Sequence, residues 1–574
     1  MYRPPIDDYD FLYTHVFGDE LLHTLGYSEL DAADVHDILT TAADFAVQVM
    51  HPLNAVGDRV GSVLAEGVVT TPPGYVKAYR SFTEAGWVGF GLDSEIGGGG
   101  VPLVVYNAVS ELWTAANTAF SLCWGLSTAA ITALQTAGSE ELRATYLPKM
   151  VSGEWTGTMN LTEPQSGTDL AAIRTTARPN GDGTWSVCGQ KIFITWGDHD
   201  LTENIVHLVL ARTPDAPEGL AGLSLFVVPK FLPSRDGGVG ERNRVTTLAL
   251  EHKLGIHASP TCVLEYDDAV GHLVGQRHFG LMAMFVMMNN TRIGVGLQGL
   301  GVADRAYQQA RDYAEQRVQG RVLGRPSGAP IAEHPDVARL LLSMSSSISA
   351  MRAFSLQLGE WCDRWRRDDS QQAAQLAEFF VPVMKAWFTE ESVRIASDAI
   401  QVHGGMGFIE ETGAAQYYRD ARILPIYEGT TGIQSNDLLG RKVIRDKGAT
   451  TALALELITS DSASLRQSQH PVARRTVERL DRAIVCARDT TRRLLELAVN
   501  DRRDAYAGSV NYLTMMALIA GAWMHARIIS AALLAHPEPT EDDLRRLREA
   551  DFYGAHHLSR VHSLAEAIRE GEIE

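Results

Sequence analysis

The stretch "TWSVCGQKIFITW", residues 184 to 196, interrupts a largely helical sequence and decides the fold. Ile192, Ile194 and Trp196 occupy alternate positions, which is the period of a half-buried β-strand, and Thr195 places a hydroxyl on the other face. More β-like runs follow in "NIVHLVLAR", "LSLFVVPK", "RVTTLALE" and "TCVLEYDD", with turn residues between runs. We therefore expect a small, mostly antiparallel β domain over residues 155 to 275.

The sequence on either side of this β region is periodic at helical spacing. Apolar residues recur at that spacing from about residue 30 to 150, and again from about 279 to 317, 332 to 368 and 371 to 403. A further helical region follows residue 450. The predicted fold class is therefore mainly α with a central β domain. The predicted domains are an N-terminal helical domain (1–154), the β domain (155–278), a helix bundle (279–446) and an additional C-terminal helical domain (447–574).

Composition limits the function classes. The chain has 574 residues, of which 45% are hydrophobic and 21% charged, as in globular proteins with sizeable cores, and its net charge of -19 disfavours nonspecific nucleic-acid binding. The N-terminus lacks the features of a signal peptide, and we expect no apolar segment long enough to span a bilayer. We expect a cytoplasmic protein without integral membrane association. The five cysteines are far apart, so neither a disulfide framework nor a metal site is predicted.

The segment "RDARILPIYEGTTGIQ", residues 419 to 434, places Glu428 among apolar and small residues. An acid before a Thr-rich helix start is favoured by the helix dipole, so Glu428 can be read as a helix-capping acid. An apolar environment also suits a general base, because desolvation raises the pKa of a carboxylate. The segment alone leaves both interpretations open.

A second chemical segment is "GTMNLTEPQSGTDLAAIRTTA", residues 157 to 177. A β-like run ends before a loop that contains Ser166, Gly167, Thr168 and Asp169. Hydroxyls and backbone N–H groups on such a loop suit a pyrophosphate or the edge of a flavin. The alternative is a turn whose side chains bond their own backbone.

Four motifs together resemble the acyl-CoA dehydrogenase family: "LTEPQSGTDL", "GQKIFIT", "QVHGGMGF" and "YRDARILPIYEGTTGIQ". The resemblance covers about residues 30 to 445. The long C-terminal addition is similar to the extended bacterial branch that includes 3-methylthiopropanoyl-CoA dehydrogenases and broad-range enzymes. The resemblance implies an N-terminal helical domain, a small antiparallel β-barrel and a C-terminal helix bundle.

The resemblance also implies α,β-dehydrogenation of a fatty or thioether acyl-CoA to the trans-2-enoyl-CoA, with FAD as cofactor. Glu428 would take the α-proton while the β-hydrogen leaves as hydride to flavin N5. Relatives with the base on a bundle helix carry Glu where this chain has Thr291, so no second base competes. The matched substrate-side residues are Thr168, Asn289, Arg292, Tyr427 and Gly429.

FAD contacts are implied at several matched positions. Thr195 would lie near flavin N5, and "QVHGG" would reach the adenine end across a dimer interface, so a homodimer is expected. Gln319 is longer than the residue common in relatives, and His403 replaces a common aromatic; it is read as a satisfied interface histidine. The matched FAD residues are Met159, Leu161, Thr162, Gly167, Thr168, Phe193, Ile194, Thr195, Arg317, Gln319, Gln401, Gly404, Gly405 and Thr430.

Two other activities share this fold. An acyl-CoA oxidase would use the same base but pass electrons to oxygen instead of electron transfer flavoprotein, which is the acceptor we expect. A DNA-associated flavoprotein of the alkylation response would carry a basic C-terminal surface. The region after residue 446 has 17 basic and 18 acidic residues, so that surface is not indicated.

Overall fold

The computed structural model describes residues 2 to 536 and 538 to 570, with every side chain in these ranges except those of residues 285 to 289. The chain divides into two compact units. The first contains Met1–Val47, Pro102–Ala115 and Val295–Glu574, and the second contains Gln48–Val101 and Ala116–Gly294. Helices α6 (Leu103–Ala116) and α9 (Gly280–Gln316) have residues in both units. The four predicted domain boundaries stay a prediction.

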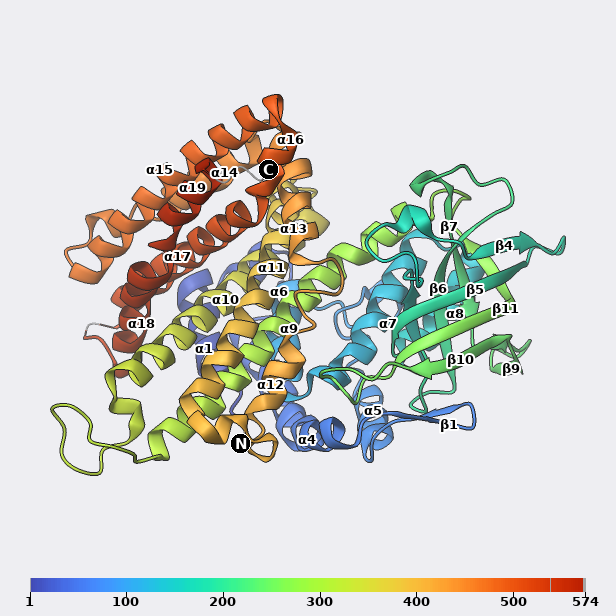
Figure 1. The fold of residues 1–574 in the computed structure, drawn as a ribbon, viewed down its shortest axis with the longest axis horizontal. Helices are drawn as coiled ribbons and strands as arrows, with labels where there is room; N and C mark the ends of the chain where they lie inside the picture. Colours follow the sequence, from blue (N-terminus) through green and yellow to red (C-terminus); the bar gives the residue numbers. More distant parts are fainter. Residues whose placement is uncertain (1, 537, 571–574) are drawn as a thin grey trace. The chain divides into compact units, whose positions relative to one another are not determined.

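A β-barrel forms the centre of the second unit (Figure 1). The strand order is β10-β11-β5-β4-β6-β3, and β7 pairs with both β11 and β6, which closes the sheet through β11, β5, β4, β6 and β7. Pairing is antiparallel except where β3 and β4 meet β6. The predicted antiparallel barrel is thus confirmed. The strands are β3 (Trp155–Asn160), β4 (Thr176–Pro179), β5 (Trp185–Thr195), β6 (Asn204–Arg212), β7 (Leu223–Pro229), β10 (Val245–Leu250) and β11 (Thr261–Val274).

Two hydrophobic clusters hold the barrel in place. One cluster includes Val187, Phe226 and Tyr266 and joins side chains from β4, β5, β6, β7, β10 and β11. The other packs α7 (Thr118–Ala137) and α8 (Glu140–Val151) against the sheet and includes Trp155, the first residue of β3. All six residues of β3 are buried, because helices cover the face that an open sheet would expose.

The second unit also contains short elements that the sequence did not predict. β1 (Val63–Ala65) and β2 (Val68–Thr70) form an antiparallel hairpin between α4 (His51–Val60) and α5 (Tyr75–Glu84). β8 (Phe231–Pro233) and β9 (Val239–Arg242) form another. Strands of three or four residues are too short to show a clear alternation, so a periodicity argument misses them.

The first unit is helical. Its bundle contains the C-terminal part of α9, α10 (Pro335–Asp368), α11 (Gln371–His403), α12 (Ala414–Ala421) and α13 (Thr431–Asp437). The glycines of α9 let neighbouring backbones approach: a Cβ at Gly299 would lie 2.6 Å from Phe388 O, and one at Gly301 would lie 2.7 Å from Ala115 N. The helices therefore pack tightly at these two positions.

The N-terminal segment ties the bundle to the C-terminal helices of the same unit. α1 (Ile6–Phe11), α2 (Leu21–Thr24) and α3 (Ala32–Phe45) form this segment. Asp8 accepts from Arg352 of α10 at 3.2 Å and from Arg545 of α18 at 2.8 Å. Tyr9 is fully buried. The segment is therefore a packed part of the unit.

The C-terminal helices are α14 (Ala449–Asp461), α15 (Pro471–Asn500), α16 (Arg502–Ala507), α17 (Ser509–Ala535), α18 (Glu541–Phe552) and α19 (Arg560–Glu570). By length and composition α17 is apolar enough to cross a membrane, so the expectation that no such segment exists was wrong. Most of α17 is buried, and it packs against α10, α15, α18 and α19. Its apolar sequence is accounted for as the core of this helical region (Figure 1).

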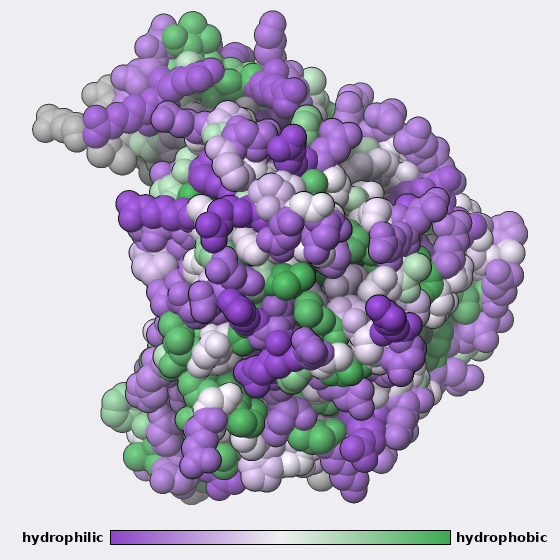
Figure 2. Space-filling model, turned by 90° about the vertical axis from the view of Figure 1, so that its right-hand side faces the viewer, coloured by the Kyte–Doolittle hydropathy of each residue, from purple (hydrophilic) through white to green (hydrophobic). Residues whose placement is uncertain are grey.

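One face of the molecule is shown by residue hydropathy in Figure 2. Hydrophilic residues cover most of this face, and hydrophobic ones occur among them in small, separated groups. Scattered apolar side chains are normal on protein surfaces.

Candidate active site

Glu428 lies in a turn between α12 and α13. Its backbone is left-handed, with φ 54°, and Gly429 follows with φ 95°. The hydroxyl oxygen of Thr430 accepts from Ile433 N at 3.3 Å and is the N-cap of α13. The capping role that the sequence left open for Glu428 is therefore filled by Thr430.

Two buried side chains from different helices hold this turn, residues 424 to 430, which we call the base loop. Lys385 of α11 is fully buried, and its Nζ donates to Leu424 O at 2.9 Å and to Gly429 O at 2.8 Å. Gln434 of α13 donates from Nε2 to Glu428 O at 3.2 Å and to Gly429 O at 3.1 Å. The carbonyls at both ends of the loop are thus drawn to one ammonium group.

Tyr427 precedes Glu428 and lies partly buried. Its hydroxyl donates to Gln298 Oε1 of α9. Burial raises the pKa of Tyr427 well above its usual value, and the negative charges of Glu428 and Asp420 raise it further. Tyr427 therefore keeps its proton at physiological pH and acts as a hydrogen-bond donor.

On the β side, Phe193 lies at a bulge in β5. The register between β5 and β11 shifts at this point, so Phe193 is an extra residue with φ 60°. Bulges re-aim a side chain out of the normal alternation. Phe193 is 57% exposed, whereas the next residue, Ile194, is only 2% exposed. An aromatic ring beside Thr195 is thus presented on the surface of the barrel.

The loop after β3, residues 161 to 169, is tied to β5 by a buried ion pair; we call it the flavin loop. Lys191 Nζ donates to Glu163 Oε1 at 2.8 Å and to Leu161 O at 3.0 Å. Ile192 N donates to Thr162 O at 2.9 Å. The two sequence motifs "LTEPQSGTDL" and "GQKIFIT" therefore meet in space.

The electrostatics of this ion pair follow from its burial. Burial alone would raise the pKa of the Glu163 carboxyl, but the charge and hydrogen bond of Lys191, with bonds from Thr175 and Arg174 N, hold it at about 2. Burial lowers the pKa of Lys191 to about 8, although Glu163 acts in the opposite direction. Both groups are charged at neutral pH.

The predicted FAD residues of the β unit divide into two kinds. The side chains of Met159 and Leu161 pack into the hydrophobic cluster under α7 and α8, so a ligand would meet their backbone. Among the described residues, no protein group bonds the hydroxyls of Thr162, Thr168 or Thr195. A Cβ at Gly167 would meet open space. Hydroxyls without a protein partner, beside an exposed aromatic ring, fit the edge and face of a flavin.

In the helical unit, the end of α9 lies beside the end of α11. The rings of Tyr313 and His403 stack with centroids 4.6 Å apart, and His403 Nδ1 lies 2.7 Å from Ala399 O. Burial lowers the pKa of His403, although the Ala399 carbonyl acts in the opposite direction. His403 is a buried, hydrogen-bonded histidine. The nearby predicted FAD residues Arg317, Gln319, Gln401, Gly404 and Gly405 are exposed.

Two of the predicted substrate residues, Asn289 and Arg292, lie on α9. Arg292 is 5% exposed. Asn289 lies outside the residues whose side chains are described. Sequence reasoning missed Lys385, Gln434, Glu163 and Lys191. A signal existed for Lys385, because "VPVMKAWF" places one lysine inside an apolar helical run.

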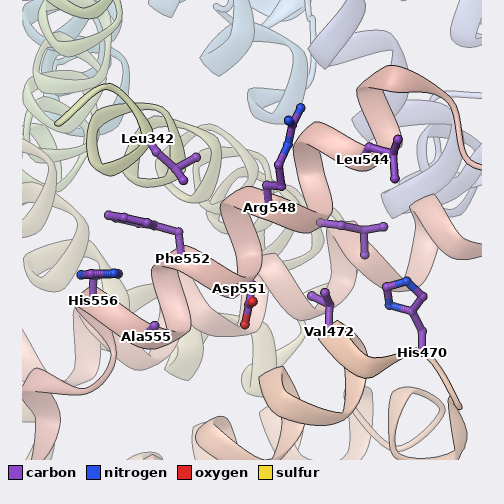
Figure 3. Close-up of a pocket in the computed structure, with 10 residues that line it drawn as sticks. Leu342, His470, Val472, Leu544, Arg548, Asp551, Phe552, Ala555 and His556 are labelled. Carbon is purple, nitrogen blue, oxygen red and sulfur yellow. The ribbon is translucent and has the colours of Figure 1, made fainter. Parts of the chain in front are cut away.

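A separate pocket of about 540 Å³ lies in the C-terminal region of the helical unit (Figure 3). Figure 3 shows Phe552 and His556 at one end and His470 with Val472 at the other. None of the predicted site residues lines it. The pocket is therefore distinct from the base loop.

Comparisons with known proteins match most of the chain. Family models match as "Acyl-CoA dehydrogenase, N-terminal domain" at residues 33–154, "middle domain" at 158–269 and "C-terminal domain" at 279–443. "Acetyl-CoA dehydrogenase C-terminal like" matches residues 454–573. These models together match residues in both units.

Two relatives and one solved structure illustrate the likeness. The chain is 46% identical to the 3-methylmercaptopropionyl-CoA dehydrogenase of Ruegeria pomeroyi, over 91% of this chain and 90% of that protein. It is 36% identical to a broad-specificity linear acyl-CoA dehydrogenase of Mycobacterium tuberculosis, over 79% and 77%. An acyl-CoA dehydrogenase from Bacillus anthracis, solved in complex with FAD, shares the fold with a TM-score of 0.77 at 22% identity, covering 94% of this chain and 89% of that one.

Proposed function

The chain belongs to the acyl-CoA dehydrogenase family, and from this premise we propose that Glu428 is the base of an FAD-dependent α,β-dehydrogenation of an acyl-CoA. Members of this family are oxidoreductases that act on CH–CH bonds and bind FAD. The product is the trans-2-enoyl-CoA.

One observation carries the assignment of Glu428. A non-glycine residue in the left-handed region is uncommon, and such strain gathers at functional sites when the surroundings over-determine it. Glu428 has this backbone, its loop is held by Lys385 and Gln434, and Thr430 rather than Glu428 caps the next helix. The loop is built to present the carboxylate.

The chemistry requires a positioned base because a thioester α-proton is a weak acid. The Glu428 carboxylate takes that proton, and the electron pair of the Cα–H bond forms the new Cα–Cβ double bond as hydride leaves Cβ. FAD, when bound, supplies the acceptor for this hydride. The Glu428 backbone N–H is the proposed donor to the thioester oxygen, where negative charge develops.

The residues present fit an FAD molecule. The hydroxyls of Thr162, Thr168 and Thr195 and the exposed Phe193 ring offer polar and aromatic contacts in the β unit. Met159, Leu161, Gly167 and Ile194 would contribute through backbone and shape. The remaining proposed contacts are Arg317, Gln319, Gln401, Gly404, Gly405 and Thr430.

A thioether acyl-CoA is the first substrate class to test. The Ruegeria pomeroyi relative is named for 3-methylmercaptopropionyl-CoA, and 46% identity over nearly the full length supports a related substrate here. Tyr427, Gly429, Arg292, Asn289 and Thr168 are the proposed substrate contacts.

The protein is proposed to act as a homodimer that passes electrons to electron transfer flavoprotein. The segment after α11 supports a partner surface, because Phe408 is 86% and Met406 51% exposed beside the exposed Gly404 and Gly405. Large exposed apolar side chains close together mark interaction sites.

The function is tested with purified holoenzyme, a ferrocenium acceptor, and straight, branched and thioether acyl-CoAs. We expect one noncovalent FAD per chain and acyl-CoA-dependent reduction of the acceptor. Light scattering should give a dimer. Peroxide formed in step with aerobic turnover would assign an oxidase instead, and a folded protein that takes up no FAD would overturn the proposal.

A further inference from the structure

Lys385 is a fully buried lysine in the middle of α11. We propose that Lys385 is a positioning residue whose ammonium closes the base loop and holds Glu428 for α-proton abstraction. This inference rests on the proposed function of Glu428. It assigns a part in catalysis to a residue that the sequence motifs do not include.

Hydrogen bonds from Lys385 join the two ends of the base loop. Leu424 O and Gly429 O bracket the turn that carries Glu428, and both accept from Lys385 Nζ, at 2.9 and 2.8 Å. Thr431 N also donates to Pro425 O at 3.1 Å. The residues between these hydrogen-bonded ends, including Glu428, are therefore held in a fixed loop.

Gln434 adds a second clamp from α13. Its Nε2 bonds Glu428 O and Gly429 O, and a Cβ at position 429 would lie 2.7 Å from that Nε2. Gly429 is therefore required by the clamp as well as by its positive φ. The left-handed conformation of Glu428 is maintained by contacts on both sides.

The cost of burying Lys385 indicates that its position matters. A buried ammonium is unfavourable unless polar groups satisfy it, and charge-assisted hydrogen bonds are stronger than neutral ones. Replacing Lys385 with methionine keeps the length and apolar stem but leaves the Leu424 and Gly429 carbonyls without this donor. The loop should then leave its strained conformation.

The direct test is amide hydrogen exchange over residues 424 to 434 in FAD-loaded enzyme. In Lys385→Met we expect exchange to be faster by at least about tenfold, because local opening determines the rate. Lys442→Met is the control, because Lys442 also contacts α11, through Glu378, but bonds no carbonyl of the base loop. It should leave this exchange unchanged.

The catalytic readout uses anaerobic mixing with 3-methylthiopropanoyl-CoA. Lys385→Met should slow bleaching of the flavin band by about 10- to 100-fold, since displacing a reacting group by about 1 Å has effects of this size. FAD content and the dissociation constant of the acyl-CoA should stay within about twofold of wild type. This separation of rate from binding would not follow from general destabilisation.

Lys385→Arg provides the second variant and decides the matter if Lys385→Met does not fold, because it keeps the positive charge but replaces the compact ammonium that bonds both carbonyls with a planar guanidinium. It should show the same changes in exchange and bleaching rate, to a smaller extent. Normal exchange and normal bleaching in the folded variants would overturn the role of Lys385. Full activity in Glu428→Gln would instead overturn the proposed base, so the two failures are distinguishable.

Discussion

Two loops in this protein are each held by a fully buried lysine, but the lysines have different partners. Lys191 bonds one carbonyl and the Glu163 carboxylate of the flavin loop, whereas Lys385 bonds two carbonyls of the base loop. A paired carboxylate with a pKa of about 2 is not a useful base at neutral pH. The buried pairing with Lys191 indicates that Glu163 serves structure, whereas Glu428 is the proposed base.

The largest expected effect separates the two acids. Glu428→Gln should lower the rate of anaerobic flavin bleaching by about 10²- to 10⁴-fold, because it removes the basic oxygen and keeps the side-chain volume. FAD content should not change. Stopped-flow absorbance with a good acyl-CoA substrate gives the rate, and a variant that loses FAD while bleaching normally would make Glu428 a structural acid.

The next effect concerns the flavin loop. Lys191→Met leaves the Glu163 carboxylate buried without its cation, which is strongly unfavourable, so the loop should rearrange. We expect FAD to dissociate about 10- to 100-fold more readily, measured by equilibrium dialysis. Lys230→Met is the control, because Lys230 pairs with the buried Asp198 of the same unit and not with this loop. An equal loss of FAD in both variants would contradict a specific role of the flavin loop in FAD binding.

A smaller effect is the pH dependence of the Glu163 pair. The pKa of Glu163 is about 2 in the folded protein against an ordinary 4.5, so the carboxylate stabilises the fold above about pH 4.5 and this contribution is lost toward pH 2. The shift corresponds to about 3 kcal/mol. The difference in Tm between wild type and Glu163→Gln should therefore narrow as pH falls from 6 to 3. A difference that does not vary with pH would contradict the pKa.

The smallest effect is expected away from both loops. His403→Phe keeps a ring stacked on Tyr313 and loses only the bond to Ala399 O. FAD affinity and turnover should remain within about twofold of wild type. A large loss of turnover with FAD retained would give His403 a chemical role that its buried position does not suggest.

Parts of this account were predictable from sequence. The alternation of Ile192 and Ile194 predicted β5, and the run around Glu428 singled out the candidate base. The hairpin of β1 and β2 was missed because its strands have three residues each. The apolar composition of α17 was not identified as a long core helix.

The lysines that hold the two loops, Lys385 and Lys191, could not be predicted from the local sequence pattern. Lys385 lies 39 residues before Leu424, and Lys191 lies 28 residues after Glu163, so only the folded chain brings them together. Of these two lysines, only Lys385 bonds the loop in which Glu428 has its left-handed backbone. The local motif identifies Glu428 as the candidate base, but tertiary contacts hold the backbone conformation of its loop.

The central claim is that Glu428 removes the α-proton, and proton exchange tests it most directly. An acyl-CoA analogue with sulfur in place of Cβ has no hydride to give, so only the proton step is observed. In D₂O the wild-type holoenzyme should replace the α-protons of this analogue with deuterium, and Glu428→Gln should do so slower by about 10²-fold or more. Exchange at the wild-type rate in a folded, FAD-loaded Glu428→Gln would contradict the claim.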